Sequence, residues 1–233
     1  MIKTPMVSVI MSVYNDEENV ANSIKSILNQ TYLNYEFIIM DDGSTDETWE
    51  IMKSFQTNSN KIKLLKNKKN IGLTRSLNKL LAESQGNFIA RQDSDDFSLR
   101  GRIESQISFI KKFNLHGCST RSIDKDKYKF VPRISHKIPP LITSKIQNPF
   151  IHGSLIIEKQ CIDKIGGYNT DFYYSQDYKL TSDLLNQGYK IKILNEIYYV
   201  SNFKDNISTN HKSEQSKFAK KVRKENLFRK KLF

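Results

Sequence analysis

The sequence predicts an α/β fold in which helices cover both faces of a mainly parallel central sheet. Two observations lead to this prediction. Short, almost continuous apolar runs recur in the first hundred residues, and the segments between them carry apolar residues at helical spacing. This alternation of strand and helix is typical of a doubly wound sheet. The chain has 233 residues, 38% of them hydrophobic, so it can bury one large core.

Each element of the first hundred residues has its own signal. Apolar and largely β-branched runs predict four strands, at residues 7–13, 35–40, 62–65 and 88–90. Asn15, with Glu18 three residues later, is expected to cap a first helix, and Ser44 with Glu47 forms a capping box for a second. A leucine-rich third helix follows the turn at 70–72, and Gly86 is expected to end it in a left-handed cap.

The pattern after residue 100 is less regular. Isoleucines at helical spacing predict one helix around residues 103–110, and the polar segment 122–148, which contains three prolines, is interpreted as a long loop. The remaining expected elements are a strand at 154–157, a turn at 165–169, a helix from Gln176 to Gly188, and strands at 190–194 and 198–200.

The net charge of +12 is concentrated at the end of the sequence. Residues 210–233 hold nine lysines and arginines against two glutamates, a net charge of +7. Apolar residues alternate with these basic ones: Phe218, Val222, Leu227, Phe228 and Leu232. We therefore expect one domain over residues 1–209 and a basic helical tail over 210–233. Such a tail is attracted to a polyanion, either nucleic acid, an acidic lipid surface or a phosphorylated ligand.

Several classes of protein are disfavoured by what the sequence lacks. No apolar run approaches the ~18 residues of a membrane span. The first apolar run is followed by Asn15 and acidic residues, without a cleavage site, so a secretory signal is not expected. Cys118 and Cys161 fit a reducing cytosol better than a disulfide framework. The lack of a glycine-rich phosphate loop argues against dinucleotide and ATP chemistry.

Polar side chains gather where the predicted strands end. They are Asn15 and Asp16, then Asp41 and Asp42, then Asp93, Asp95 and Asp96. The carboxyl ends of parallel strands meet at one edge of a sheet, where ligands bind. In Asp93-Ser94-Asp95 the two carboxylates lie on the same side of an extended segment, so both can face one ligand. They suit Mg²⁺ or Mn²⁺ with a diphosphate, or hydrogen bonds to sugar and base, although acidic turns also occur on ordinary surfaces.

The sequence resembles the family 2 glycosyltransferases of GT-A fold, inverting bacterial enzymes that build surface polysaccharides. The resemblance is carried by SIKSILNQTY at 23–32, DDGSTD at 41–46, NIGL at 70–73, DSDD at 93–96, GGYN at 166–169 and QDY at 176–178. It is dense to about residue 105 and resumes from about 148 to 185. It implies a nucleotide-sugar-binding half over 1–100 and an acceptor-binding half over 101–209.

The resemblance also implies roles for residues on the nucleotide-sugar side. Tyr14 would lie against the base, and Asp42 would accept a hydrogen bond from it. Asp93 would bind the ribose or the water shell of a divalent metal, Mn²⁺ or Mg²⁺, and Asp95 would be a metal ligand gripping the diphosphate. Four further residues are expected nearby: Arg75 and Arg91 at phosphate or base, unless they are plain surface cations, Asp41 holding its loop or a neighbouring strand, and Asp96 in a structural role.

On the acceptor side the resemblance implies a general base at the start of a helix. Inversion needs one carboxylate opposite the leaving nucleotide, to take the proton of the acceptor hydroxyl. Asp177 occupies that position, although a helix cap would show the same pattern. Gln176 stands where the family has Glu and could bind an acceptor hydroxyl. His152 could contact acceptor or diphosphate, or be purely structural, and His211 could close over the diphosphate.

These residues together predict an inverting, metal-dependent glycosyltransferase. It would move a hexose or N-acetylhexosamine from a UDP-linked donor to a lipopolysaccharide, lipo-oligosaccharide or capsule acceptor, expected to be lipid-linked. A sugar nucleotidyltransferase would need a glycine-rich basic first loop, and a nucleic-acid-binding protein would need a basic and aromatic face rather than an acidic edge. The enzyme is expected in the cytoplasm, on the inner face of the membrane through the tail. Packing of the tail on the domain or on a second subunit, and a homodimer, remain alternatives.

Overall fold

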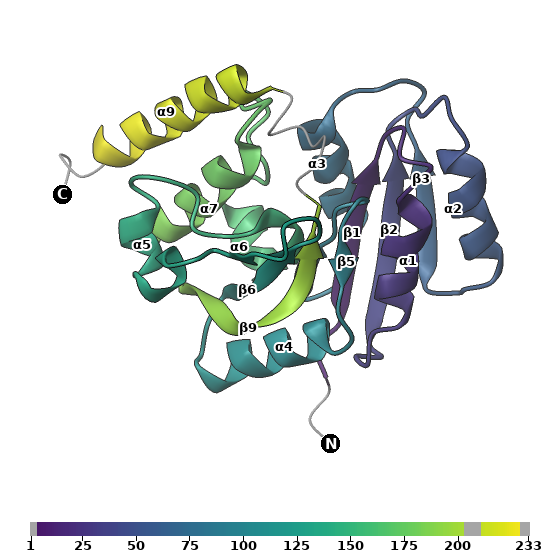
Figure 1. Cartoon of the computed structure of the whole chain (residues 1–233), viewed down its shortest axis with the longest axis horizontal. Coiled ribbons are helices and arrows are strands. Elements are labelled where there is room, and N and C mark those ends of the chain that lie inside the picture. Colours follow the sequence, from purple (N-terminus) through teal and green to yellow (C-terminus); the bar gives the residue numbers. More distant parts are fainter. Residues whose placement is uncertain (1–3, 203–210, 229–233) are drawn as a thin grey trace.

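The computed structural model describes residues 4–202 and 211–228, and within these residues one nine-stranded sheet runs through the molecule. The strand order is β3-β2-β1-β4-β8-β6-β9-β5, and β7 pairs with β6. Figure 1 shows this sheet with helices on both sides, which confirms the predicted α/β layering. Among these residues no helix has both the length and the apolar character needed to cross a bilayer.

The first half of the sheet is parallel, as predicted. Its strands are β1 (Val7–Val13), β2 (Tyr35–Asp41), β3 (Ile62–Lys66) and β4 (Phe88–Arg91). On one face lie α1 (Val20–Leu28), α2 (Thr48–Thr57) and α4 (Arg102–Lys112). They form a buried core with Val7, Val9 and Met11, the alternate residues of β1 that point to this face. On the other face α3 (Leu73–Glu83) packs on Ile10 and Ile38. Both faces of β1 are buried, which explains its continuous apolar sequence.

The second half of the sheet is mixed. β8 (Ile156–Glu158) joins antiparallel to β4, and β6 (Gly117–Asp124) and β9 (Ile191–Ser201) follow, parallel to each other. The short strands are β5 (Phe97–Ser98), on β9, and β7 (Phe130–Val131), on β6. The other helical segments are η1 (Ser135–Lys137), α5 (Pro140–Thr143), η2 (His152–Ser154), α6 (Lys159–Lys164), α7 (Gln176–Asn186) and α9 (Lys212–Phe228).

Two predicted helix caps are wrong, because the loops after β1 and β2 bond to each other. Asn15 has a φ of 47°, and its side-chain oxygen accepts a hydrogen bond from the Thr45 amide at 2.9 Å. Ser44 accepts one from the Asn15 amide through Oγ at 2.9 Å, and the Glu47 amide donates to Glu17 Oε2 at 2.8 Å. The cap residues therefore join two loops at the carboxyl edge of the sheet, and both helices begin later than expected.

Gly86 does not end α3 in a left-handed cap. That helix ends at Glu83, and Ser84 after it is extended, with φ −81° and ψ 131°. A Cβ on Gly86 would lie 2.5 Å from the backbone nitrogen of Ser8 in β1. The glycine is needed because two backbones approach closely, and not for a turn.

The expected loop at 122–148 contains structure, and the expected strands at 190–194 and 198–200 are one strand. β6 was missed because its buried residues Ser119, Thr120 and Ser122 are polar. Ser201 Oγ bonds Ser122 Oγ at 3.1 Å, and Thr120 Oγ1 donates to the Arg121 carbonyl at 2.9 Å, so two of these hydroxyls are satisfied, whereas Ser119 Oγ has no partner among the described residues. β9 continues because its pairing with β6 passes through a register shift rather than a break.

The tail forms the expected helix, and that helix packs on the domain. Figure 1 shows α9 lying over α7. Val222 is fully buried against Phe172 and Tyr178, with Phe218 packed beside it. Glu225 forms an ion pair with Lys179 of α7 at 2.9 Å. The alternative of a packed tail is therefore confirmed for Lys212–Phe228, while Leu232 and the side chain of Phe228 lie outside the described residues.

Candidate active site

The acidic residues after β2 are fixed by the loops around them. The buried carboxylate of Asp42 accepts hydrogen bonds from the backbone amides of Ile71 and Gly72, at 3.0 and 2.9 Å, and from Asn67 Nδ2 at 2.8 Å. Its Oδ2 receives only the Gly72 bond and can accept one more. Asp41 accepts the Ser44 amide at 2.9 Å and so holds its loop, as expected. Asp42 is thus a rigid acceptor at the carboxyl edge.

Asp93, after β4, rests on a buried arginine. Arg91 Nη2 lies 2.5 Å from Asp93 Oδ1, and Nη1 donates to the Ile10 carbonyl at 2.9 Å. Its Nε faces His152 Nε2 at 3.4 Å. Arg91 is 2% exposed, whereas the Asp93 side chain is 32% exposed. The arginine donors are therefore directed at protein atoms beneath Asp93, and the Asp93 carboxylate stays partly exposed.

Asp95 lies among other carboxylates. Burial, followed by the negative charges of Asp93 and Asp16, raises the pKa of Asp95 to about 7. Asp16 Oδ2 is buried and has no hydrogen-bond partner in the described structure. Clustered carboxylate oxygens whose negative charge is not balanced are suitable ligands for a hard divalent cation such as Mg²⁺ or Mn²⁺. Within residues 4–202 and 211–228 no three acidic, histidine or cysteine side chains are grouped to hold a metal by themselves, so phosphate oxygens and water would complete the shell.

Tyr199 of β9 holds the loop that carries these acids. Its hydroxyl accepts the Asp93 amide at 3.2 Å and donates to the Asp96 carboxylate, which also accepts the Asn202 amide at 2.7 Å. Burial, then Asp93 and Asp95, raises the pKa of Asp96. A Cβ on Gly153 would meet this hydroxyl and would lie 2.6 Å from Asp93 Oδ2. Asp96 is thus structural, as expected, and Gly153 leaves room for Asp93.

Two more residues expected on the nucleotide side lie at the same edge. Tyr14 directly follows β1 and is 48% exposed, so its ring is free to stack on a ligand. Arg75 is exposed in the first turn of α3, directly after the segment whose amides hold Asp42. Neither position conflicts with the expected contacts.

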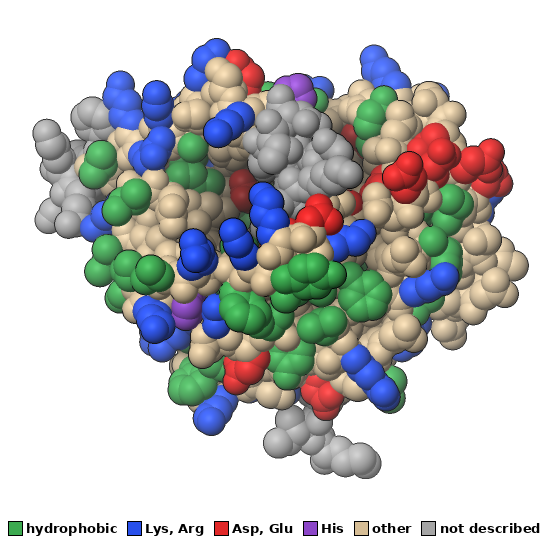
Figure 2. Space-filling view, viewed as in Figure 1, with side chains coloured by type: hydrophobic (Ala, Val, Ile, Leu, Met, Phe, Trp, Pro, Cys, Tyr) green, Lys and Arg blue, Asp and Glu red, His purple; other side chains and the backbone are tan. Residues whose placement is uncertain are grey.

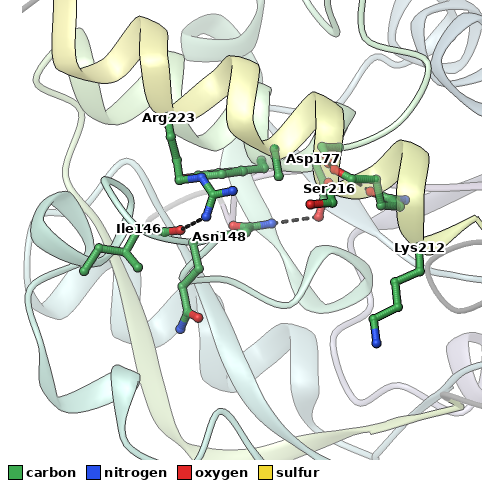
Figure 3. Close-up of a pocket in the computed structure, with 11 residues that line it drawn as sticks. Ile146, Asn148, Asp177, Lys212, Ser216 and Arg223 are labelled. Carbon is green, nitrogen blue, oxygen red and sulfur yellow. Dashed lines mark hydrogen bonds between the residues drawn. The ribbon is translucent and has the colours of Figure 1, made fainter.

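Asp177 lies in the first turn of α7 and faces a pocket of about 350 Å³ (Figure 3). Its Oδ2 accepts a hydrogen bond from Asn148 Nδ2 at 2.7 Å. Burial raises the pKa of Asp177, while the bonds from Asn148 and from the Tyr178 amide lower it in part. A carboxylate that is oriented, open to a pocket and raised in pKa has the properties of a general base.

The tail helix forms one wall of this pocket. Lys212, Gln215 and Arg223 of α9 line it together with Asp177 and Asn148, and Figure 3 shows Lys212 and Arg223 on this helix, on either side of Asp177. Arg223 Nη1 donates to the Ile146 carbonyl at 3.1 Å. Gln176 is 8% exposed and lies outside the residues that line the pocket, since successive residues of a helix point in different directions. His211 packs near Tyr174, with ring centroids 5.3 Å apart.

His152 and Tyr168 connect the two acidic places. The Tyr168 hydroxyl lies 2.8 Å from His152 Nε2, the atom that Arg91 also faces. Burial and then the Arg91 charge hold the pKa of His152 well below its usual value, so the ring is neutral. Tyr168 in turn is close enough to feel the charges of both Asp93 and Asp177.

Sequence reasoning missed several residues of this arrangement: Asn148, Tyr168, Tyr199 and Gly153. Asp16, which it placed at the carboxyl edge with Asp95, was given no role there. The others act through contacts between distant segments, such as the 29 positions from Asn148 to Asp177, and no local pattern marks them.

Comparison with known proteins agrees with this geometry. Residues 8–172 match the family described as Glycosyl transferase family 2. The putative glycosyltransferase EpsE of Bacillus subtilis is 40% identical over 171 residues, 71% of this chain and 61% of that protein. The Escherichia coli UDP-Glc:alpha-D-GlcNAc-diphosphoundecaprenol beta-1,3-glucosyltransferase WfaP is 31% identical over 199 residues, 83% of this chain and 76% of that protein.

A solved structure shows the same fold. The mannosyltransferase PcManGT from Pyrobaculum calidifontis, in complex with GDP-Man and Mn²⁺, superposes with a TM-score of 0.76. The two are 18% identical, and the match covers 93% of this chain and 62% of that one. The family match, the relatives and the shared fold lead to one conclusion: the chain belongs to glycosyl transferase family 2 and has the GT-A fold.

Proposed function

We propose that the protein is an inverting glycosyltransferase that moves a hexose or N-acetylhexosamine from a UDP-linked donor to a lipid-linked saccharide of a surface polysaccharide. The observation that carries the proposal is the pairing of two acidic places. Asp93 and Asp95 lie at the carboxyl edge of the sheet, Asp177 faces a separate pocket, and Tyr168 is close to both. With the donor diphosphate bound at Asp93 and Asp95 and the acceptor hydroxyl bound at Asp177, the donor sugar and the acceptor would meet between these two sites.

Donor binding is assigned to the carboxyl edge. Tyr14 offers an exposed ring for the base, and Asp42 Oδ2 can accept a hydrogen bond from a base N–H. Asp93 and Asp95 would hold Mn²⁺ or Mg²⁺, which supplies charge neutralisation for the departing diphosphate. We assign Arg91 the positioning of Asp93 rather than contact with the donor, because its donors are directed at Asp93, Ile10 and His152.

Asp177 is proposed as the base. Its carboxylate removes the proton of the acceptor hydroxyl as that oxygen attacks the anomeric carbon, from the face opposite the nucleotide. The hydrogen bond from Asn148 holds the Asp177 carboxylate at the pocket, where it can take this proton. One displacement by one hydroxyl inverts the anomeric configuration, and no covalent sugar–enzyme intermediate is required.

The acceptor pocket suits a ligand with negative charge. Lys212 and Arg223 both line it, and in the described part of the chain Lys212 makes no ion pair. The relative WfaP is named for an acceptor sugar carried on a lipid diphosphate. A diphosphate beyond the acceptor sugar would meet these cations, which supports a lipid-linked acceptor and a place for the enzyme on the inner face of the cytoplasmic membrane.

Calorimetric titration of UDP with and without Mn²⁺ tests the donor site independently of transfer. The parent protein should bind UDP more tightly with Mn²⁺, and Asp95→Asn should lose that gain, because the diphosphate loses its anchor. Asp126→Asn, an exposed aspartate outside the site, is the matched control. A folded Asp95→Asn protein that keeps the full Mn²⁺ gain would remove Asp95 from the metal site.

A further inference from the structure

Large hydrophobic side chains are exposed in one segment before the acceptor pocket. Residues 128–146 connect β6 to the start of that pocket and contain β7, η1 and α5. Six of their side chains expose between 48% and 77% of their surface: Tyr128, Phe130, Ile134, Leu141, Ile142 and Ile146. Elsewhere in the described chain, such side chains occur one at a time along the sequence. A concentration of this kind marks an interaction surface.

The same segment is basic. Residues 125–146 hold six lysines and arginines and one aspartate, a net charge of +5. Lys125, Lys127, Lys129, Arg133 and Lys137 are exposed. Figure 2 shows basic side chains scattered among hydrophobic ones over the left half of the face that it presents. We call residues 125–146 the excursion surface. Its partner should therefore combine an apolar interior with negative charge.

The excursion surface is anchored from beneath, so its apolar side chains are held outward. Thr143 and Ser144 are buried. The Ser144 carbonyl accepts hydrogen bonds from the Tyr178 hydroxyl at 2.6 Å and from Asn226 Nδ2 of α9 at 3.0 Å. Arg223 of α9 bonds the Ile146 carbonyl beside it. These bonds fix α5 against α7 and α9. The exposed isoleucines therefore belong to an ordered segment and are held facing solvent.

We propose that the excursion surface docks on an anionic lipid bilayer. Isoleucine, tyrosine and phenylalanine side chains would enter the interface, and the surrounding lysines and arginines would attract acidic headgroups. The tail helix adds charge and Leu227, which is 58% exposed, whereas Val222 is buried and cannot contribute. Most of the apolar contact thus comes from residues 128–146 rather than from the tail.

The position of the surface gives the docking a purpose. The segment continues without a break from Ile146 to Gln147 and Asn148, which line the pocket that Asp177 faces. A bilayer on the excursion surface would lie beside the pocket mouth, where a saccharide on a lipid diphosphate could enter while its lipid stays in the membrane. This step rests on the proposed function, whereas the lipid contact itself does not.

Vesicle co-sedimentation of the full chain tests the docking. The parent should sediment with vesicles of phosphatidylglycerol and phosphatidylethanolamine, and only weakly with phosphatidylcholine alone. Serine at two exposed positions, Ile134→Ser with Ile142→Ser, should weaken the partition about tenfold or more without adding charge. Leu33→Ser is the matched control, since Leu33 is 77% exposed and lies just before β2, at the amino end of that strand and away from the carboxyl edge. High salt should also weaken binding, because it shortens the Debye length to ~3 Å at 1 M.

Three results would overturn the inference. They are failure of the parent to sediment with anionic vesicles, equal sedimentation of the parent and the double variant, and a parent dimer in light scattering that the double variant converts to a monomer. The last would assign the surface to a second copy of the chain. Circular dichroism and UDP titration with Mn²⁺ check that each variant is folded. Because UDP binding is measured separately, failure of membrane docking is distinguishable from failure of the donor site.

Discussion

Asn148 donates a hydrogen bond from Nδ2 to Oδ2 of Asp177 at 2.7 Å. The two residues are 29 positions apart, and the bond joins the segment just after the excursion surface to the first turn of α7. The Asn148 side-chain oxygen in turn lies 3.2 Å from Thr181 Oγ1, one turn further along the same helix. The amide is thus bound at both ends to α7, and it holds the Asp177 carboxylate in place at the pocket.

Replacing Asp177 by asparagine should abolish transfer and spare donor binding. Asparagine keeps the size of the side chain but cannot take a proton, and general-base catalysis contributes about 10²–10⁴-fold to rate. We expect kcat to fall by that factor while the affinity for UDP and Mn²⁺ stays unchanged. Asp171→Asn, on an exposed aspartate six residues earlier, should leave kcat unchanged. Near-normal turnover of Asp177→Asn at saturating donor would exclude Asp177 as the base.

The same substitution should not destabilise the protein at neutral pH. Burial raises the pKa of Asp177 in the folded state, so the ionised carboxylate weakens folding above that pKa, and the penalty disappears below the unfolded value of about 3.9. Asp177→Asn should therefore melt at the same temperature as the parent or higher at pH 7, with a smaller difference near pH 4. A lower melting temperature at pH 7 would indicate that Asp177 mainly stabilises α7.

Asn148→Ala should shift the pH dependence of transfer. The hydrogen bond from Asn148 stabilises the ionised form of Asp177 and lowers its pKa, so its loss should raise that pKa. The acid limb of kcat/KM, already above the usual aspartate range in the parent, should move to higher pH. Gln147→Ala, which alters the same pocket without touching Asp177, should leave the limb in place. A fall in rate with an unshifted limb would contradict a role through Asp177.

Arg91→Gln should weaken the response to metal. Without the guanidinium, Asp93 loses the 2.5 Å ion pair that orients it, and loss of such supporting contacts typically costs about 10–100-fold in metal affinity. The Mn²⁺ concentration needed for half-maximal UDP binding should rise by that range. Arg100→Gln, on an exposed arginine after β5, is the control. If Arg91→Gln lowers the melting temperature but leaves the Mn²⁺ requirement unchanged, the arginine has only a structural role.

Val222→Ala should destabilise the fold even though it lies in the tail. Val222 is fully buried against Phe172 and Tyr178, and removing two methyl groups from such a site should cost about 1–3 kcal/mol. Leu227→Ala on the same helix removes a side chain that is 58% exposed and should change stability by less than about 0.5 kcal/mol. Urea unfolding of both variants measures the difference, and equal midpoints would mean that α9 does not pack on α7 in solution.

Local sequence patterns predicted a strand correctly where the environment of its side chains is the same along its whole length. β1 and β2 were predicted almost to the residue because both faces are buried, which makes most of their positions apolar. β6 was not predicted, since Ser119, Thr120 and Ser122 are buried although they are polar, and Ser122 finds its hydroxyl partner, Ser201, on another strand. Such a strand is recognisable only when the strands beside it are known.

The candidate site likewise contains residues that the sequence identified and residues that it did not. Asp42, Asp93, Asp95 and Asp177 follow strands or open a helix within motifs that resemble those of the family, and the sequence identified them as candidates. Their partners were not identified: Asn148 reaches Asp177 across the fold, and Gly153 matters because a Cβ there would meet Asp93 Oδ2. Arg91 was expected at phosphate or base, or else as a surface cation. Its burial and its bond to the Ile10 carbonyl were not foreseen, because both depend on the packed sheet.

The position of α9 over the Asp177 pocket sets an order of events during protein synthesis. The strands and loops at the donor edge, through Asp95, leave the ribosome first, and the pocket floor of residues 146–178 follows. The wall formed by Lys212–Phe228 is translated after every other part of the pocket. A nascent chain stopped before this helix would carry the proposed donor-site residues and the proposed base but lack one wall of the Asp177 pocket. Completion of that pocket is thus tied to translation of α9.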